Sequence, residues 1–277
     1  MTADRTGWPA DVPRPQPPVW KVFDVGVDVL AGGEVVAEML VDAGMTAGRG
    51  LASAGLVALL ADCILGTDAA LRSRSRIATA VLTIDIVGRP PEAGLLRAVS
   101  GRHGRRAGFL LTSATISADE EEIAHVSGWF ALRGGASAPL ASSSPRRPDV
   151  PTAEPWPTPL GRTLGLTRFE RAQDGGVSFE LPHVGPLSNS GGTLHGGVAA
   201  LMATVAALST LDDAEPEVLS MTCHYLRAAG GDDGPVRVTG RQIRRGRTSA
   251  VVQGDVHAAD GRPAMQTVLT VALPGRR

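Results

Sequence analysis

The sequence predicts an α+β protein made of two similar halves, each an antiparallel sheet packed on one long helix. Both halves show the same order of elements, which is alternating strands, an apolar helix and further strands. Two distant features also repeat at nearly the same offset, since Ser53 aligns with His195 (195 − 53 = 142) and Arg106 aligns with Arg247 (247 − 106 = 141). A shared offset of this kind is typical of a tandem repeat.

Two segments precede and separate these halves. Residues 1–18 are rich in proline and contain no apolar core of the signal-peptide type, so we expect a disordered N-terminus. Residues 134–158 are dominated by Pro, Ser and Gly, which predicts an extended linker. The N-terminal domain is therefore expected at 19–133 and the C-terminal domain at 159–275.

The elements of each half follow from the period of the apolar residues and from the glycine-containing turns. Apolar and polar residues alternate in the strands, whereas the helices are continuous apolar runs. We expect alternating strands around a turn at 22–41 and 164–182, helices at 52–72 and 195–211, and strands leading into a long hairpin at 78–88 and 218–228.

Composition narrows the class of protein. The formal net charge of −1 provides no field to attract nucleic acid or an anionic membrane. No apolar run approaches the ~20 residues that cross a bilayer, so we expect no membrane span and a cytoplasmic location. The two cysteines, Cys63 and Cys223, make neither a disulfide framework nor a metal-binding set, and the histidines show no metal-ligand spacing.

One polar, glycine-rich stretch opens the second apolar helix. The stretch "NSGGTLHGG" contains Asn189, His195, Gly196 and Gly197, and "VAALMATVAAL" follows it. This pattern resembles the hotdog-fold thioesterases of the phenylacetate-pathway (PaaI-like) type. The resemblance implies two tandem hotdog domains, each an antiparallel sheet wrapped around a long helix, that pair as an intramolecular pseudo-dimer. It also implies an acyl-CoA substrate, no cofactor apart from that coenzyme A, and a homo-oligomer such as a dimer of double hotdogs.

The family pattern also has a carboxylate nine residues after the histidine, and here it is divided between the halves. The C-terminal half has Thr204 at that position. The N-terminal half has Ser53 and Ala47 where the histidine and asparagine would be, yet it carries Asp62 at the carboxylate position. The resemblance therefore implies one complete composite site, and a mirror site that has lost its functional residues. The complete site would hold Asp62, Asn189, His195 and Gly196.

Helix geometry supports a composite site independently of the family. Nine helical residues rise about 13–14 Å, so a histidine at a helix mouth cannot easily meet a residue nine positions along the same helix. Two antiparallel helices related by a pseudo-two-fold axis can bring the mouth of one near the middle of the other. Moreover, Asp62 lies within "LVALLADCIL", where burial is unfavourable unless the carboxylate is paired or used.

Each residue of the predicted site has a chemical role. The Gly196 N–H at the helix N-terminus can stabilise an oxyanion, and the glycines allow the substrate to approach the backbone. His195 and Asn189 would position and polarise the carbonyl group or the attacking water. Asp62 would be a general base or a nucleophile, and the sequence does not distinguish the two. A Gly-rich helix entry with a capping side chain is the structural alternative for this stretch.

Further residues are candidates for substrate binding. Thr79 lies near the position where some relatives carry a catalytic Ser or Thr, although the sequence favours an ordinary strand threonine there. Arginine side chains suit the phosphates of coenzyme A, and two basic sets occupy hairpin starts. Solvated turn charge is the alternative for most of them. The substrate-binding candidates are Gly197, Thr79, Arg106, Arg245 and Arg247.

These observations predict an enzyme that hydrolyses acyl-CoA thioesters to a free acid and coenzyme A. Two rivals stay open, a non-catalytic acyl-CoA-binding or regulatory protein and a hotdog-type enoyl-CoA hydratase or dehydratase. The length and head group of the acyl chain cannot be read from the sequence.

Overall fold

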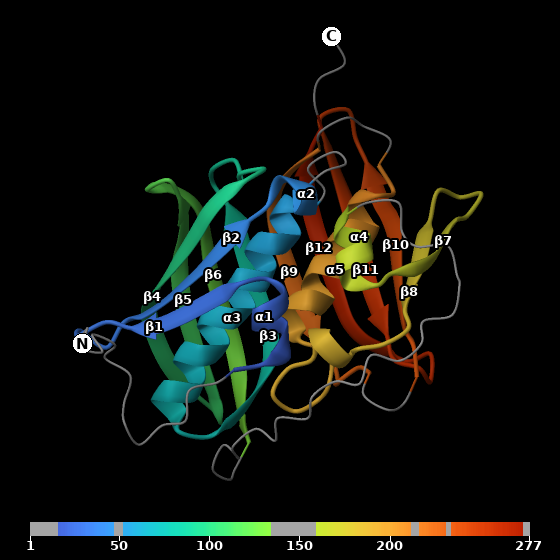
Figure 1. The fold of residues 1–277 in the computed structure, drawn as a ribbon. Coiled ribbons are helices and arrows are strands. Elements are labelled where there is room, and N and C mark those ends of the chain that lie inside the picture. The colour runs from blue at the N-terminus through green and yellow to red at the C-terminus, as the bar shows by residue number, and fades with distance from the viewer. Residues whose placement is uncertain (1–15, 47–51, 134–158, 212–215, 231–233, 274–277) are drawn as a thin grey trace.

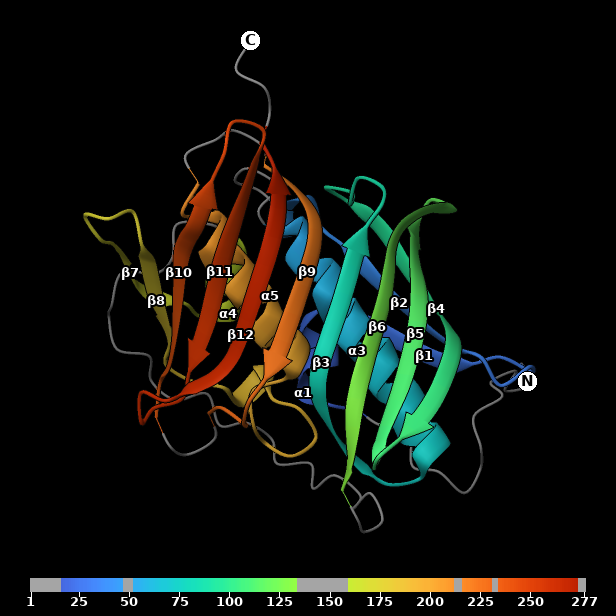
Figure 2. The ribbon, with the colours of Figure 1, turned by 180° about the vertical axis from the view of Figure 1, so that it is seen from behind.

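A computed structural model describes residues 16–46, 52–133, 159–211, 216–230 and 234–273. Its strands form a single twelve-stranded sheet in which every pair of neighbours is antiparallel. The two long helices lie side by side on one face of this sheet (Figure 1). Seen from behind, the sheet lies in front of both helices (Figure 2).

The N-terminal half wraps six strands around one helix of 21 residues. Its strands alternate buried and exposed side chains, so that one face packs on the helix. Its elements are α1 (Pro18–Val22), β1 (Val25–Val29), β2 (Val35–Val41), α2 (Ala43–Thr46), α3 (Ser53–Ser73), β3 (Arg76–Ile86), β4 (Gly94–Arg106), β5 (Phe109–Ala118) and β6 (Glu121–Arg133).

The C-terminal half repeats this plan with a shorter helix. A 3-10 turn and a loop lead from its first hairpin into the helix. Its elements are α4 (Pro159–Leu164), β7 (Thr167–Arg171), β8 (Val177–Leu181), η1 (Gly185–Leu187), α5 (Gly196–Leu208), β9 (Glu217–Tyr225), β10 (Val236–Arg245), β11 (Ser249–His257) and β12 (Pro263–Ala272).

The strand order confirms the duplication. The sheet runs β1-β2-β4-β5-β6-β3 in one half and continues β9-β12-β11-β10-β8-β7 in the other, so the second order is the mirror image of the first. The halves join where β3 pairs with β9, with Leu82 opposite Cys223 and Thr83 opposite Thr222. The predicted α+β class with two tandem repeats is therefore confirmed.

The two long helices pack closely at two glycines, Gly55 and Gly197, which occupy equivalent positions in the two halves. A Cβ atom on Gly55 would lie 2.5 Å from Leu201 Cδ1, and one on Gly197 would lie 2.9 Å from the Cα atom of Leu59. The offset is 142 for both the glycines (197 − 55) and the leucines (201 − 59), as predicted for this part of the repeat. The mouth of α5 therefore packs on the middle of α3, which is the geometry that a composite site requires.

The register of the last hairpin differs from the sequence alignment by one residue. Arg105 pairs with Leu110 in the N-terminal half, and Arg245 pairs with Ala250 in the C-terminal half. Both residues of the pair are thus offset by 140 (245 − 105 and 250 − 110), whereas the alignment of Arg106 with Arg247 gave 141. A slip of one residue turns each side chain to the other face of a strand, and the buried residues Leu110 and Ala250 fix the true register.

The structure differs from two further expectations, one at the N-terminus and one on helix α3. Helix α1 begins at Pro18, within the segment expected to be disordered, and proline suits the first turn of a helix. Residues 1–15 and the predicted linker 134–158 lie outside the described residues, so the domain boundaries stay predictions. The expectation that no apolar run approaches membrane-spanning length is wrong, since α3 meets that criterion by length and composition, although most of it is buried inside the structure.

Candidate active site

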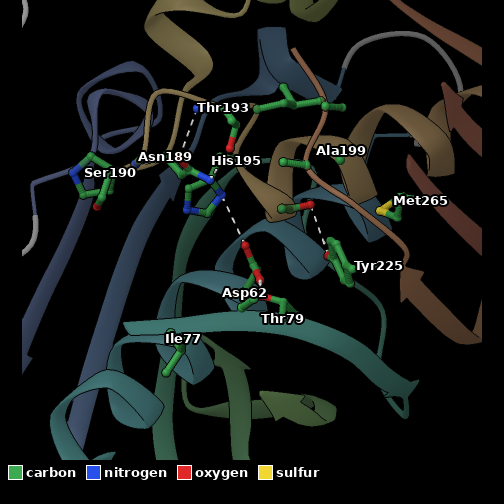
Figure 3. Close-up of a pocket in the computed structure, with 18 of the residues that line it drawn as sticks. Asp62, Ile77, Thr79, Asn189, Ser190, Thr193, His195, Ala199, Tyr225 and Met265 are labelled. Carbon is green, nitrogen blue, oxygen red and sulfur yellow. Dashed lines mark hydrogen bonds and ion pairs between the residues drawn. The ribbon is translucent and has the colours of Figure 1, made fainter. Parts of the chain in front are cut away.

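Asp62 lies in the middle of α3 and is only 7% exposed. Its Oδ1 atom accepts a hydrogen bond of 3.1 Å from the Thr79 hydroxyl on β3. Its Oδ2 atom accepts one of 2.7 Å from the Gly197 N–H and lies 3.3 Å from His195 Nδ1. Figure 3 shows His195 and Asp62 pointing toward each other across the boundary between the halves. The buried carboxylate is therefore held by donors from both halves of the chain.

His195 is the N-cap of α5, with an extended backbone conformation. Its Nδ1 atom accepts a hydrogen bond of 3.1 Å from the Gly197 N–H, the same donor that binds Asp62. Its own backbone N–H donates to the carbonyl oxygen of Leu187 at 3.0 Å, which fixes the chain as it enters the helix. The imidazole thus satisfies a free N–H group of the first helical turn and stays beside the carboxylate.

Burial lowers the pKa of His195 below its usual 6.5, and the opposing charge of Asp62 only partly offsets this effect. The ring is therefore neutral at neutral pH. In the tautomer whose Nδ1 accepts the Gly197 N–H, the ring proton lies on Nε2. The neutral imidazole can consequently donate a hydrogen bond from its other nitrogen.

Gly196 lies beside Asp62 at the helix mouth. A Cβ atom at this position would come within 2.8 Å of Asp62 Oδ2, so only glycine fits without displacing the carboxylate. Its carbonyl oxygen accepts a hydrogen bond of 3.1 Å from the hydroxyl of Tyr225. Its N–H group has no hydrogen-bond partner among the residues that the structure describes. A donor at the positive end of the α5 dipole is therefore available to a ligand.

Asn189 organises the loop that leads to the helix. Its Oδ1 atom accepts hydrogen bonds from the Gly191 N–H at 2.7 Å and the Thr193 N–H at 3.3 Å, and its Nδ2 atom donates to the Thr193 hydroxyl at 2.9 Å. A side-chain amide has two N–H groups, so one is left for a ligand. Asn189 thus combines the structural role with a remaining donor, and the residue lines the pocket.

A cavity of ≈ 840 Å³ brings the predicted residues together. Both halves of the chain line it, and its walls include predicted site residues from each half: Asp62, Thr79, Asn189, His195 and Gly196. Its volume lies within the range of ordinary small-molecule sites. The structure thus places four elements of the prediction, the two helices, the loop and β3, around a single cavity.

Other predicted residues lie elsewhere. Gly197 does not line the cavity, because it packs on Leu59 and its N–H is taken by Asp62 and His195. Three of the arginines expected to bind the substrate do not line it either, and all three are exposed: Arg106, Arg245 and Arg247. Arg106 instead borders a separate hollow of ≈ 330 Å³ beside Phe109. The sequence could locate the reacting groups but not the arginines near them.

The mirror positions carry no comparable chemistry. Thr204 is completely buried, and its hydroxyl contacts the sulfur of Met221 at 3.5 Å. Ser53 is also buried, and no hydrogen bond from its side chain is found among the described residues. The third position, Ala47, lies outside the described residues.

The buried thiols do not compete as nucleophiles. Cys63 lines the cavity next to Asp62, and burial together with the carboxylate raises its pKa strongly. Burial also raises the pKa of Cys223 to about 12. A thiol must ionise to attack, so both cysteines stay inert at neutral pH. Among the described residues, no group of His, Cys, Asp or Glu side chains could hold a metal ion.

Sequence reasoning missed several residues of the cavity wall. Tyr225 is the only tyrosine in the chain, and burial raises its pKa well above 10, so it acts as a hydroxyl donor. Its position at the end of β9, beside the helix mouth, requires knowledge of the sheet order. Other missed residues of the wall include Trp20, Arg76, Arg133 and Arg227.

A protein-family model matches part of the C-terminal half of the chain. Residues 183–272 match the model of the acyl-CoA thioesterase N-terminal domain. The match includes the loop, α5 and strands β9 to β12. No curated protein matches the chain.

Solved structures match almost the whole chain. A proposed thioesterase II from Thermobifida fusca YX shares 13% identity, with 94% of this chain and 99% of that chain covered and a TM-score of 0.66. The acyl-CoA thioesterase II TesB2 from Mycobacterium marinum shares 12% identity, with 93% and 97% covered and a TM-score of 0.64. A protein with a hotdog fold from Alicyclobacillus acidocaldarius shares 14% identity, with 87% and 94% covered and a TM-score of 0.58. The chain therefore has a double hotdog fold, whereas the closer relation to the phenylacetate type stays a prediction.

Proposed function

We propose that this double hotdog protein, whose C-terminal half matches the model of a thioesterase domain, hydrolyses acyl-CoA thioesters at one composite site per chain. One observation carries the proposal. The carboxylate of Asp62 from the N-terminal half lies 2.7 Å from the N–H of Gly197 and 3.3 Å from His195 Nδ1, at the helix mouth of the C-terminal half. The base thus lies at the helix mouth, where the N–H of Gly196, unpaired among the described residues, is the oxyanion donor and both residues line the cavity.

In the proposed reaction, a water molecule attacks the thioester carbonyl carbon. Asp62 accepts a proton from this water as a general base, or attacks the carbon itself and is released by water in a second step. The tetrahedral intermediate collapses, the carbon–sulfur bond breaks, and the thiolate of coenzyme A leaves and takes up a proton. The products are the free acid and coenzyme A, and no further cofactor takes part.

Two donors can stabilise the negative oxygen of the intermediate. The N–H of Gly196 has no partner among the described residues and lies at the positive end of α5. The Nε2–H of neutral His195 is the second donor. Fixed donors in a water-excluded cavity supply a large part of the rate enhancement in acyl-transfer enzymes.

Thr79 and Asn189 support this constellation. The Thr79 hydroxyl holds one carboxylate oxygen of Asp62, which leaves the other oriented toward the helix mouth. Asn189 holds the loop and has one N–H free for the substrate carbonyl or the attacking water. We therefore assign Thr79 to positioning and Asn189 to both positioning and binding.

A thiol-release assay separates this proposal from its rivals. Purified protein is incubated with acyl-CoAs of varied chain length and head group, and free thiol is followed with a thiol-reactive dye. Thiol release supports hydrolysis. Calorimetric binding without release would support a non-catalytic acyl-CoA-binding protein, and loss of the enoyl absorbance without thiol release would support a hydratase.

A further inference from the structure

The cavity extends from Asp62 along the C-terminal part of α3. Asp62 contacts Thr79, and a Cβ atom on Gly66 would lie 4.0 Å from Ile77 Cδ1, so α3 and β3 run antiparallel along this part of the wall. Eight helical residues separate Asp62 from Ala70, which also lines the cavity. This part of the cavity is therefore about 12 Å long.

Two arginines lie at its far end. Arg76 begins β3 and Arg133 ends β6, and the two residues are direct cross-strand partners. Both line the cavity and both are exposed. Like charges directly opposite each other destabilise a sheet, so this pair is unfavourable without a counter-charge.

The described residues provide no such counter-charge. Neither the Arg76 side chain nor the Arg133 side chain makes a hydrogen bond or an ion pair within the described ranges. Nearby arginines behave differently, since Arg72 pairs with Asp68 at 2.8 Å and Arg227 pairs with Asp260 at 3.4 Å. Two positive charges thus lie together at the end of the cavity, and no described residue compensates them.

We propose that Arg76 and Arg133 form an anion subsite of the cavity, and this inference rests on the proposed function for the identity of the ligand. The subsite takes an anionic oxygen group carried by the thioester substrate, at the end of the cavity away from Asp62. Two guanidinium groups side by side suit a phosphate or a carboxylate. The phosphate would come from coenzyme A, and the carboxylate from the far end of a dicarboxylic acyl group.

Arg76 and Arg133 replace the arginines that the sequence analysis proposed for substrate binding. Arg106, Arg245 and Arg247 do not reach the cavity, whereas Arg76 and Arg133 do so through the register of β3 and β6. A matched control is available in Arg105 and Arg106, which are exposed neighbours on β4 and lie outside the cavity wall. Their neutralisation changes the net charge by the same amount.

The experiment compares the variant Arg76→Gln/Arg133→Gln with Arg105→Gln/Arg106→Gln on three thioesters of the acyl chain that the wild type prefers. These are the acyl-CoA, the acyl-pantetheine, which lacks the phosphates, and the ω-carboxy form of the acyl-pantetheine. Loss of the charged hydrogen bonds should raise KM by about tenfold or more in the first variant, with little change in kcat.

The pattern of KM identifies the anion. A rise confined to the acyl-CoA assigns the subsite to a phosphate, and a rise confined to the ω-carboxy thioester assigns it to an acyl carboxylate. KM values equal to those of the wild type on all three substrates, or an equal rise in the control variant, would overturn the subsite.

A binding measurement keeps this inference separate from hydrolysis. Calorimetric titration with coenzyme A and with a dicarboxylic fatty acid needs no turnover. If the wild type hydrolyses nothing but binds either ligand, and Arg76→Gln/Arg133→Gln alone loses this binding, the subsite stands while the proposed function fails. Absence of binding to the wild type, together with absence of hydrolysis, would refute both.

Discussion

At the scale of single residues, the peptide between Gly196 and Gly197 is held at both ends. Its carbonyl oxygen accepts from Tyr225 at 3.1 Å, and its N–H donates to Asp62 at 2.7 Å. The orientation of this peptide fixes the helix mouth relative to the carboxylate. Tyr225 is therefore a positioning residue that acts through the backbone.

Replacing Tyr225 with phenylalanine tests this role, because the ring stays and only the hydroxyl is lost. A neutral hydrogen bond contributes about 0.5–1.5 kcal/mol, so we expect kcat to fall about 2- to 10-fold while KM stays the same. Steady-state kinetics at saturating and limiting acyl-CoA measure both values. A raised KM with an unchanged kcat would show that Tyr225 only contacts the substrate.

His195 makes stability depend on pH in a defined direction. Its pKa is lowered in the folded protein, so below pH 6.5 the unfolded chain binds a proton that the folded chain does not. The free energy of unfolding should therefore fall as the pH drops below about 6.5, and this contribution should be constant at higher pH.

The variant His195→Asn provides the comparison for this effect. We expect wild type to lose more stability than the variant between pH 7.5 and pH 5.5, as measured by urea unfolding at each pH. Parallel curves for the two proteins, or a wild type that gains stability in acid, would contradict the assignment of a neutral buried imidazole.

At the scale of elements, the close contact of α3 with α5 positions the site. Gly55 has no room for a methyl group, since the added Cβ would lie 2.5 Å from Leu201 Cδ1 and 3.1 Å from its Cα atom. Gly66, on the same helix, has ordinary contacts at 3.9 Å and 4.0 Å. The two glycines offer a matched pair.

Alanine at these two positions should have opposite effects on stability. Gly55→Ala should destabilise the protein by about 1–3 kcal/mol through overpacking. Gly66→Ala should stabilise it by up to about 1 kcal/mol, because alanine is the better helix former. Urea midpoints of both variants measure these changes, and equal shifts of the same sign would contradict the helix–helix contact.

The elements also show what a sequence can predict. The apolar runs at 52–72 and 195–211 correspond to α3 and α5, and the alignment of Ser53 with His195 agrees with the packing of Gly55 and Gly197. The predicted alignment of the two last hairpins was wrong by one residue. Similar residue types near a turn do not show which face of a strand is buried. Long apolar runs and the residue offset between the two halves can be read directly from a sequence, whereas the pairing of residues across strands cannot.

At the scale of the whole molecule, the duplicated fold explains why one chain needs both halves. The strand order is mirrored about β3 and β9, so the mouth of α5 meets the middle of α3. The arginine pair at 76 and 133 depends on the pairing of β3 with β6, and the hydroxyl of Tyr225 depends on the position of β9 beside the mouth of α5, and no local pattern in the sequence marks them. The expected homo-oligomer and the cytoplasmic location stay predictions.

The central claim is that a single composite site depends on Asp62. Asp68 is a matched control, since it is a buried aspartate on the same helix that pairs with Arg72 away from the helix mouth. Thr204→Val keeps the shape of the mirror position and removes only its hydroxyl. All three variants can be compared with the wild type by one measurement, kcat/KM for acyl-CoA hydrolysis, with circular dichroism to verify the fold.

We expect Asp62→Asn to lower kcat/KM by at least ~10²–10⁴, as loss of a general base or nucleophile does. Asp68→Asn should lose stability through its broken ion pair but keep its activity, and Thr204→Val should leave kcat/KM unchanged. If Asp62→Asn stays as active as Asp68→Asn, or if Thr204→Val loses as much activity as Asp62→Asn, the single composite site is wrong.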